Sequence, residues 1–126
     1  MNKKTILLVE DEIIIAITTK IILENYGYIV IIVNTGEDAI KTIKNIPNIQ
    51  LLLIDIDLGK GLNGIETAEI ILKNYDIPII FRSSHIEQDI IEKIKNIKKI
   101  TSYSYITKNS NNVDLDISIK MAFKLL

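Results

Sequence analysis

Four carboxylates, one serine and one lysine stand where short apolar segments of this sequence end. In chain order they are Glu10, Asp11, Asp55, Asp57, Ser83 and Lys108. Carboxylates that lie close together repel one another unless a divalent cation joins them, and Mg²⁺ prefers such oxygen ligands. An aspartate can act as a covalent nucleophile toward phosphorus, while a cation and a hydroxyl donor offset the developing negative charge. If the fold brings these residues together, they have the composition of a Mg²⁺-dependent phosphoryl-transfer site.

The hydrophobic pattern predicts alternating strands and helices. Residues 51–54 are consecutive apolar residues bounded by loop signals, as in a strand that is buried on both faces. By the same reasoning we expect strands at residues 5–9, 28–33, 50–54, 77–83 and 103–107. Between and after them we expect helices at residues 13–26, 35–46, 63–75, 84–97 and 113–125.

Local signals mark several of these helices. In the first, Ile14, Ile17, Ile21 and Ile22 recur at helical spacing, and Gly27 ends the segment.

Capping residues predict the starts of two further helices. Thr35 is the expected cap of the second helix, with acidic residues in its first turn, and Pro47 ends that helix. The sequence Ser84-His85-Ile86-Glu87 has the pattern of a capping box and predicts the start of the fourth helix.

This alternation of strands and helices predicts an α/β fold in which helices cover both faces of a parallel sheet. We expect a flavodoxin-like, doubly wound sheet of five parallel strands in the order 2-1-3-4-5, with five helices. In such a sheet the carboxyl ends of strands 1, 3, 4 and 5 are neighbours, and ligands bind at this edge. The six polar residues should therefore meet there.

Composition excludes several other kinds of function. The 126 residues, 1–126, are expected to form one domain, with 48% hydrophobic and 25% charged residues as in ordinary globular proteins. A net charge of −1 gives no basic footprint for direct nucleic-acid binding or for an anionic membrane surface. The sequence has no cysteine and no apolar run of membrane-spanning length, so we expect a cytoplasmic protein without disulfides.

With these motifs, the sequence resembles the receiver domain of two-component response regulators over nearly its whole length. The resemblance implies that Asp55 is the phosphoryl acceptor. It also implies a Mg²⁺ site that Asp55 shares with Asp11 as a direct ligand, with Glu10 acting through the hydration shell, and with the backbone carbonyl of Asp57.

Three further roles follow from the same resemblance. Lys108 would bind the phosphoryl group, and Ser83 would contact a phosphoryl oxygen and draw its loop inward. Tyr105 matches the aromatic residue whose rotamer changes with the state of the switch. The rearrangement would alter the face formed by the fourth helix, the fifth strand and the fifth helix. That face could bind an output domain or a second copy of the chain.

The function that the resemblance implies is a phosphorelay switch, not an enzyme that acts on a separate substrate. A histidine kinase or a histidine phosphotransfer domain would donate the phosphoryl group from a phosphohistidine, and water would slowly remove it. The receiver would be either free-standing or part of a longer regulator or hybrid histidine kinase.

The sequence departs from the family pattern at several positions. Asn109 replaces the proline that usually follows the lysine, which predicts a trans peptide bond there. Arg82 occupies a position that is usually apolar, and Ser84 replaces a common alanine. The loop from Asp55 to Gly64 is one residue longer than in the commonest receivers and lacks their proline.

Other interpretations stay open for single residues and for the whole chain. Asp57 and His85 could flank the path of the attacking water, or they could be ordinary exposed residues, and Tyr105 could be a plain core aromatic. Arg82 and Asn109 keep open a degenerate receiver-like interaction module that is not phosphorylated. A haloacid-dehalogenase-type phosphatase is a weaker alternative, because that family places its aspartate motif on the first strand. A flavodoxin-like cofactor carrier is weak as well, because the acidic loop after the first strand would repel a phosphate.

Overall fold

The structure, a computed structural model, describes residues 3–84, 87–97 and 103–124 of the chain. Its strands are β1 (Thr5–Val9), β2 (Ile29–Val33), β3 (Leu51–Asp55), β4 (Ile79–Ser83) and β5 (Tyr103–Thr107). Its helices are α1 (Ile13–Asn25), α2 (Gly36–Asn45), α3 (Gly64–Leu72), α4 (Gln88–Lys95) and α5 (Asn112–Ala122).

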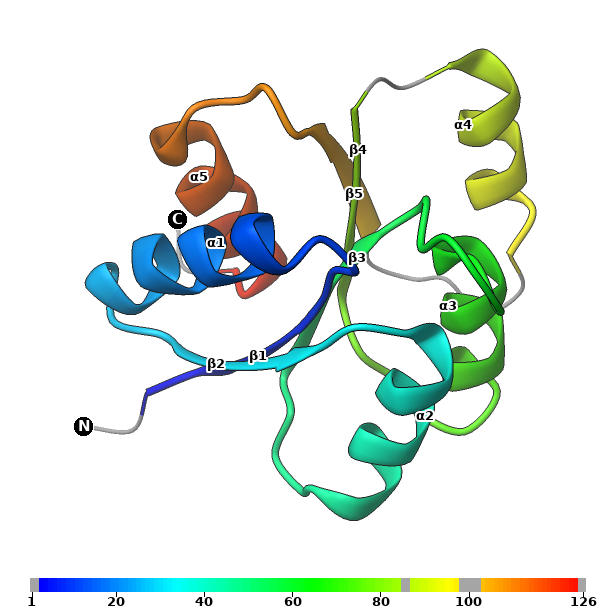
Figure 1. Cartoon of the computed structure of the whole chain (residues 1–126), viewed down its shortest axis with the longest axis horizontal. Helices are drawn as coiled ribbons and strands as arrows, with labels where there is room; N and C mark the ends of the chain where they lie inside the picture. Colours follow the sequence, from blue (N-terminus) through cyan, green and yellow to red (C-terminus); the bar gives the residue numbers. More distant parts are fainter. Residues whose placement is uncertain (1–2, 85–86, 98–102, 125–126) are drawn as a thin grey trace.

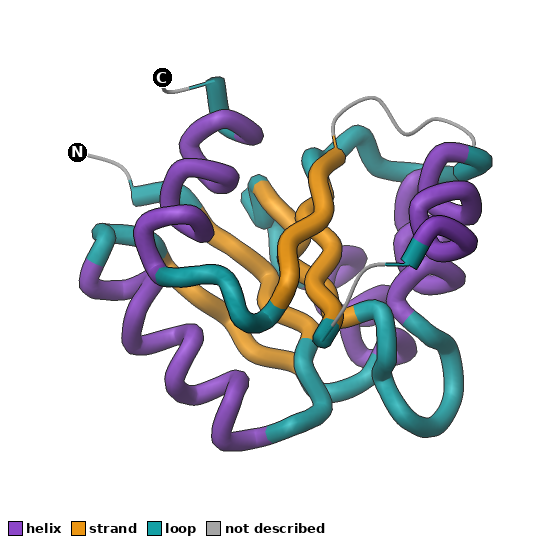
Figure 2. Tube along the Cα trace, turned by 90° about the horizontal axis from the view of Figure 1, so that it is seen from above, coloured by secondary structure: helices purple, strands orange, loops and turns teal. Residues whose placement is uncertain are grey.

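The strands form one parallel sheet in the order β2-β1-β3-β4-β5, which confirms the predicted topology. Helices α1 and α5 cover one face of this sheet, and α2, α3 and α4 cover the other (Figure 1). Seen from above, the strands lie as a central layer between the two groups of helices (Figure 2). Because each strand is followed by a helix that returns to its start, all carboxyl ends of the strands lie at one edge of the sheet.

Both faces of the sheet are apolar, and each supports its own part of the core. Leu52, Ile54 and Phe81 belong to the cluster beneath α2, α3 and α4. Leu53 and Ile80 belong to the cluster beneath α1 and α5. Side chains alternate along a strand, so a strand that is covered on both sides needs apolar residues at every position. This requirement explains why the first four residues of β3, residues 51–54, are apolar, whereas the fifth, Asp55, is a buried carboxylate at the end of the strand.

Helix α1 forms as predicted, but the isoleucines that indicated it are not its buried face. Its buried residues are Ala16, Thr19 and Leu23. Its exposed residues include Ile13, Ile14, Ile17 and Ile21, of which Ile14 is 81% exposed. We call these four side chains the α1 isoleucine surface. Isoleucine occurs on every side of this helix, so the spacing identified a helix without identifying which face packs against the sheet.

The predicted start of the fourth helix is wrong. Helix α4 begins at Gln88, and Glu87 is its N-cap instead of the last residue of a capping box. Ser84 precedes the helix, so it has no capping role, and His85 and Ile86 lie outside the described residues.

Other boundaries agree closely with the prediction. Thr35 caps α2, and its Oγ1 accepts a hydrogen bond from the Asp38 backbone N at 3.0 Å. The third strand is shifted by one residue, so that Asp55 is the last residue of β3 instead of following it. The peptide bond before Asn109 is trans, as predicted. Within the described ranges, no helix combines the length and the hydropathy that a membrane crossing requires.

Gly64 lets α3 begin directly against the end of β3. Its backbone N donates a hydrogen bond to the Ile56 carbonyl at 2.9 Å. A Cβ atom at this position would overlap the backbone carbonyl of Asp55. The absence of a side chain at Gly64 therefore fixes the distance between α3 and the strand end that carries Asp55.

We expect Gly64→Ala to lower the free energy of unfolding by roughly 1–3 kcal/mol, because the added methyl group must displace the strand end. Helix propensity alone favours alanine over glycine by up to about 1 kcal/mol, so the sign of the change separates the two effects. Urea unfolding measures it, with Glu69→Ala as the control on the exposed side of α3. A Gly64→Ala variant as stable as the wild type would contradict this account.

Candidate functional site

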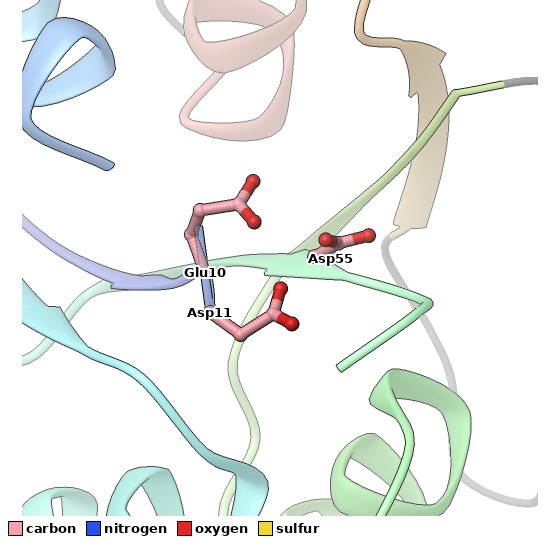
Figure 3. Close-up of side chains that lie close together, drawn as sticks. All are labelled: Glu10, Asp11 and Asp55. Carbon is pink, nitrogen blue, oxygen red and sulfur yellow. The ribbon is translucent and has the colours of Figure 1, made fainter. Parts of the chain in front are cut away.

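Three carboxylates gather at the carboxyl edge of the sheet. Glu10 and Asp11 follow β1, and Asp55 ends the neighbouring strand β3. One oxygen from each lies within 4.8 Å of the others, and Figure 3 shows the three side chains converging. Glu10 is 1% exposed and Asp55 is 3% exposed, whereas Asp11 is partly open to solvent. The sheet topology thus brings together the acidic residues that the sequence separates.

Lys108 places its ammonium group among these carboxylates. Its Nζ lies 2.7 Å from Asp55 Oδ2, 3.1 Å from Glu10 Oε1 and 3.7 Å from Glu12 Oε2. The backbone N of Lys108 donates to the Ser83 carbonyl at 2.8 Å, which ties the residue after β5 to the end of β4. The lysine side chain is only 14% exposed. Lys108 is therefore a positioned counter-cation and not a freely moving surface lysine.

The Lys108 cation only partly offsets the effect of burial and charge repulsion on Glu10. Burial, with repulsion from Asp55 as the next cause, raises the pKa of Glu10 from 4.5 to about 7, although Lys108 acts in the opposite direction. Burial alone would lower the pKa of Lys108, but its hydrogen bonds with Asp55 and Glu10 prevail and raise that pKa above its usual value. The pocket stabilises added positive charge.

Backbone hydrogen bonds hold the two buried carboxylates in place. Asp55 Oδ1 accepts from the Asp57 backbone N at 3.1 Å, and Glu10 Oε2 accepts from the Glu12 backbone N at 3.2 Å. The backbone of Glu10 is itself fixed, since its carbonyl accepts from Asn34 Nδ2 at 3.0 Å. These bonds orient the carboxylates before any ligand arrives, which reduces the cost of binding.

The donor set fits a hard divalent cation. Its groups are carboxylate oxygens, and Mg²⁺ takes oxygen ligands and favours one or two carboxylates. Glu10 Oε1 is buried and accepts no hydrogen bond, although it faces the Lys108 ammonium. A buried carboxylate oxygen without a hydrogen bond can accept a further cationic ligand.

The other residues proposed from the sequence lie at different distances from this centre. Asp57 is exposed in the loop after β3. Ser83 is buried at the end of β4 and contacts the site through the carbonyl that holds Lys108. Tyr105 lies on β5, is 39% exposed, and stacks on Tyr103 with ring centroids 6.5 Å apart. His85 lies outside the described residues, so the structure does not place it relative to Asp57.

Sequence reasoning did not select two residues that contribute to the site. Glu12 adds a third carboxylate beside Lys108, and the acidic run that contains it was the available signal. Glu37, at the start of α2, accepts a hydrogen bond from the Leu62 backbone N at 3.2 Å and so holds the loop after β3. Gly59 and Gly61 give this loop its positive φ angles of 72° and 80°. No local pattern links Glu37 to a loop so distant in sequence.

Comparisons with a family profile and with solved structures identify the same family. The profile of the response regulator receiver domain matches residues 6–120. A CheY-like receiver domain protein from Methanospirillum hungatei JF-1 has a TM-score of 0.87 at 30% identity, covering 98% of this chain and 96% of that one. The N-terminal domain of a response regulator/sensory box/GGDEF protein from Carboxydothermus hydrogenoformans has a TM-score of 0.86 at 37% identity, covering 97% and 95%.

Curated relatives are longer than this chain. The transcriptional regulatory protein YvrH of Bacillus subtilis is 30% identical over 98% of this chain, which spans 51% of YvrH. The phyllosphere-induced regulator PhyR of Methylorubrum extorquens is 32% identical over 66% of this chain, and the match spans 32% of PhyR. The likeness to these relatives therefore concerns one part of each.

The raised pKa of Glu10 leads to a pH dependence of stability. Its native value of about 7 exceeds the ordinary 4.5, so native Glu10 binds its proton more tightly than unfolded Glu10 does. The contribution of protonated Glu10 to the free energy of unfolding is complete below about pH 4.5 and is lost as the pH rises through 7. Without divalent ions, we expect the wild-type free energy of unfolding to fall between pH 5 and pH 8.

Glu10→Gln cannot titrate and should show a smaller fall over the same range, and Mg²⁺ should restore wild-type stability at pH 8. Urea unfolding at each pH measures both effects, with the exposed Glu69→Gln as the control. Parallel pH profiles for wild type and Glu10→Gln would refute this assignment.

Proposed function

We propose, from the premise that this chain belongs to the response regulator receiver domain family, that it is a signalling switch whose phosphoryl acceptor is Asp55. The observation that carries the proposal is the setting of Asp55. Its buried carboxylate ends β3, lies 2.7 Å from Lys108 Nζ, and shares its pocket with Glu10 and Asp11. This is an anionic nucleophile with cationic groups beside it, which is what attack on an anionic phosphoryl group requires.

In the proposed reaction an Asp55 carboxylate oxygen forms a bond to phosphorus. The bond from phosphorus to the histidine nitrogen of a donor protein breaks, and its electron pair stays with the imidazole. The Lys108 ammonium, which pairs with the Asp55 carboxylate before the reaction, then pairs with the phosphoryl oxygens. The Ser83 hydroxyl donates a hydrogen bond to one of these oxygens. Asp11, Asp55 and the Asp57 carbonyl would hold Mg²⁺, with Glu10 acting through its hydration shell, and the ion would supply charge neutralisation when bound. Water later attacks phosphorus, the bond from phosphorus to the Asp55 oxygen breaks, and inorganic phosphate leaves while the carboxylate is regenerated.

The output of the switch is a shift between two populations of the α4, β5 and α5 face. Two observations support this location. Helix α4 buries Ile94 as its only core residue in the described helix, so few contacts oppose its movement. Strand β5 is only half covered, with Tyr103 and Tyr105 exposed at its surface. An output domain or a second copy of the chain is the proposed partner of this face.

The α1 isoleucine surface is the proposed docking surface for the phosphohistidine donor. It begins at Ile13, two residues after Asp11, and therefore borders the site. A run of exposed isoleucines on one helix is unusual for a surface that faces only water. An apolar surface next to the acceptor suits a protein donor, such as a histidine kinase or a histidine phosphotransfer domain.

Incubation with acetyl phosphate and Mg²⁺ tests the acceptor directly. We expect intact-mass measurement to show one added phosphoryl group on the wild type and none on Asp55→Asn. Removal of Mg²⁺ with a chelator should abolish the modification. A folded wild-type protein that gains no mass would favour a receiver-like interaction module that is not phosphorylated. Reversion of Arg82 and Asn109 to the residues usual in the family would then be the next test.

Substitution of the α1 isoleucine surface tests the donor. We expect Ile14→Ser with Ile17→Ser to slow phosphoryl transfer from a phosphorylated histidine phosphotransfer domain by about tenfold, since exposed hot-spot residues contribute on this scale. The rate with acetyl phosphate should not change, because a small donor needs no docking surface. Ile46→Ser, at the opposite edge of the sheet, is the matched control. Equal slowing with both donors would place the effect in the site and not in docking.

A further inference from the structure

Arg82 is a second cation on the face of the sheet that carries Asp55. It lies on β4 and pairs with Asp55 of β3 in the register of the sheet. Side chains two residues apart along a strand share a face. Leu53 and Ile80, two residues before Asp55 and Arg82, both belong to the core beneath α1 and α5. Asp55 and Arg82 therefore project side by side into the layer under these helices.

The arginine is buried and anchored. It is 9% exposed, and its Nη1 donates a hydrogen bond to Thr19 Oγ1 of α1 at 3.1 Å. Thr19 is itself only 3% exposed. Burial lowers the pKa of the Arg82 guanidinium, while attraction to Glu10 and Asp55 opposes that shift. Arginine remains protonated in proteins, so a positive charge is held under the site.

A buried arginine needs negative groups and hydrogen-bond acceptors in place of its lost hydration, whereas an apolar residue at the same position needs none. Removing a charge from water is unfavourable unless other charges and hydrogen bonds replace its hydration. The carboxylates of Glu10 and Asp55 are the negative groups that attract it, and they are the two most buried acids of the site. Because Arg82 and Asp55 are register partners on adjacent strands, the guanidinium charge is held beside the acidic pocket.

We propose that Arg82 is a fixed internal cation of the Asp55 pocket, which weakens the binding of divalent ions and stabilises the negative charge that a phosphoryl group adds. The second half of this inference rests on the proposed function, and the first half does not.

A count of formal charges gives the expected signs. The carboxylates of the ionised pocket belong to Glu10, Asp11, Glu12 and Asp55, and its cations are Lys108 and Arg82, so it carries two net negative charges. Without Arg82 it carries three, and a divalent cation is attracted more strongly. A phosphoryl group brings additional negative charge, and loss of Arg82 leaves that charge less compensated. The difference of one unit is the same whether Glu10 is protonated or ionised.

A purely structural role gives a different expectation. If Arg82 only ties β4 to α1 through Thr19, then its loss loosens the site and weakens every ligand. The electrostatic role predicts opposite changes for the two ligands. Thr19→Val removes the hydrogen-bond acceptor but leaves the arginine charge, so it is the matched control for the structural role.

The experiment compares wild type, Arg82→Leu and Thr19→Val at pH 8 and low salt. Isothermal titration with Mg²⁺ alone measures the first affinity, and titration with the phosphoryl analogue beryllofluoride at saturating Mg²⁺ measures the second. For Arg82→Leu we expect about three- to tenfold tighter Mg²⁺ binding and about three- to tenfold weaker beryllofluoride binding. Thr19→Val should bind both ligands like the wild type. Arg82→Met carries the same expectation if the leucine variant does not fold.

Two outcomes overturn the inference. A folded Arg82→Leu that binds Mg²⁺ as the wild type does, or more weakly, shows that the charge does not act on the pocket. Thr19→Val that reproduces the changes of Arg82→Leu shows that packing against α1 is responsible. If wild type binds Mg²⁺ but neither beryllofluoride nor a phosphoryl group, the proposed function fails, and the Mg²⁺ titrations still decide the role of Arg82.

Discussion

The burial of like charges at the carboxyl edge of the sheet is the constraint on which the rest of the structure depends. Glu10 and Asp55 are almost fully shielded from water and lie close to each other. Carboxylates in such a place are costly unless cations reach them. Lys108 reaches them from the end of β5, and Arg82 carries a second positive charge on the same sheet face. Burial, followed by repulsion from Asp55, raises the pKa of Glu10 to about 7, although Lys108 opposes this shift.

The order of the strands in the parallel sheet brings these charged side chains together. Each charged residue of the site lies at or near the end of a different strand, and these strands are neighbours in the sheet although they are far apart in the sequence. The residues are Glu10, Asp55, Arg82 and Lys108. Helices on both faces exclude water from the strands, which strengthens every charge interaction at the edge. Gly64 then lets α3 begin in direct contact with the end of β3. The apolar core and the polar site are consequently parts of one packing arrangement.

The sequence was sufficient to predict the topology, because each strand is a compact apolar run and each helix is bounded by its own signals. It was also sufficient to indicate that Glu10, Asp55 and Lys108 would approach one another, since strand order alone places their strand ends together. The sequence was insufficient wherever a contact between residues far apart in the chain determines which side chains are buried. Thr19 lies on the buried side of α1 and accepts a hydrogen bond from Arg82 of β4, and no local spacing of isoleucines contains that information. The capping-box pattern at residues 84–87 failed because local propensity does not determine where α4 begins.

Helix α1 combines a close contact with the sheet on one side and an exposed apolar surface on the other. Small and polar residues on its inner side, Ala16 and Thr19, let it lie close to the sheet and accept the Arg82 guanidinium. Larger side chains in place of Ala16 and Thr19 would not fit at this distance from the sheet, because interiors are packed at high density. Ile14 and Ile17 lie on the outer side of the helix, where they are exposed instead of filling the core. The hydrogen bond with the buried arginine and the exposed isoleucines therefore belong to opposite sides of one helix.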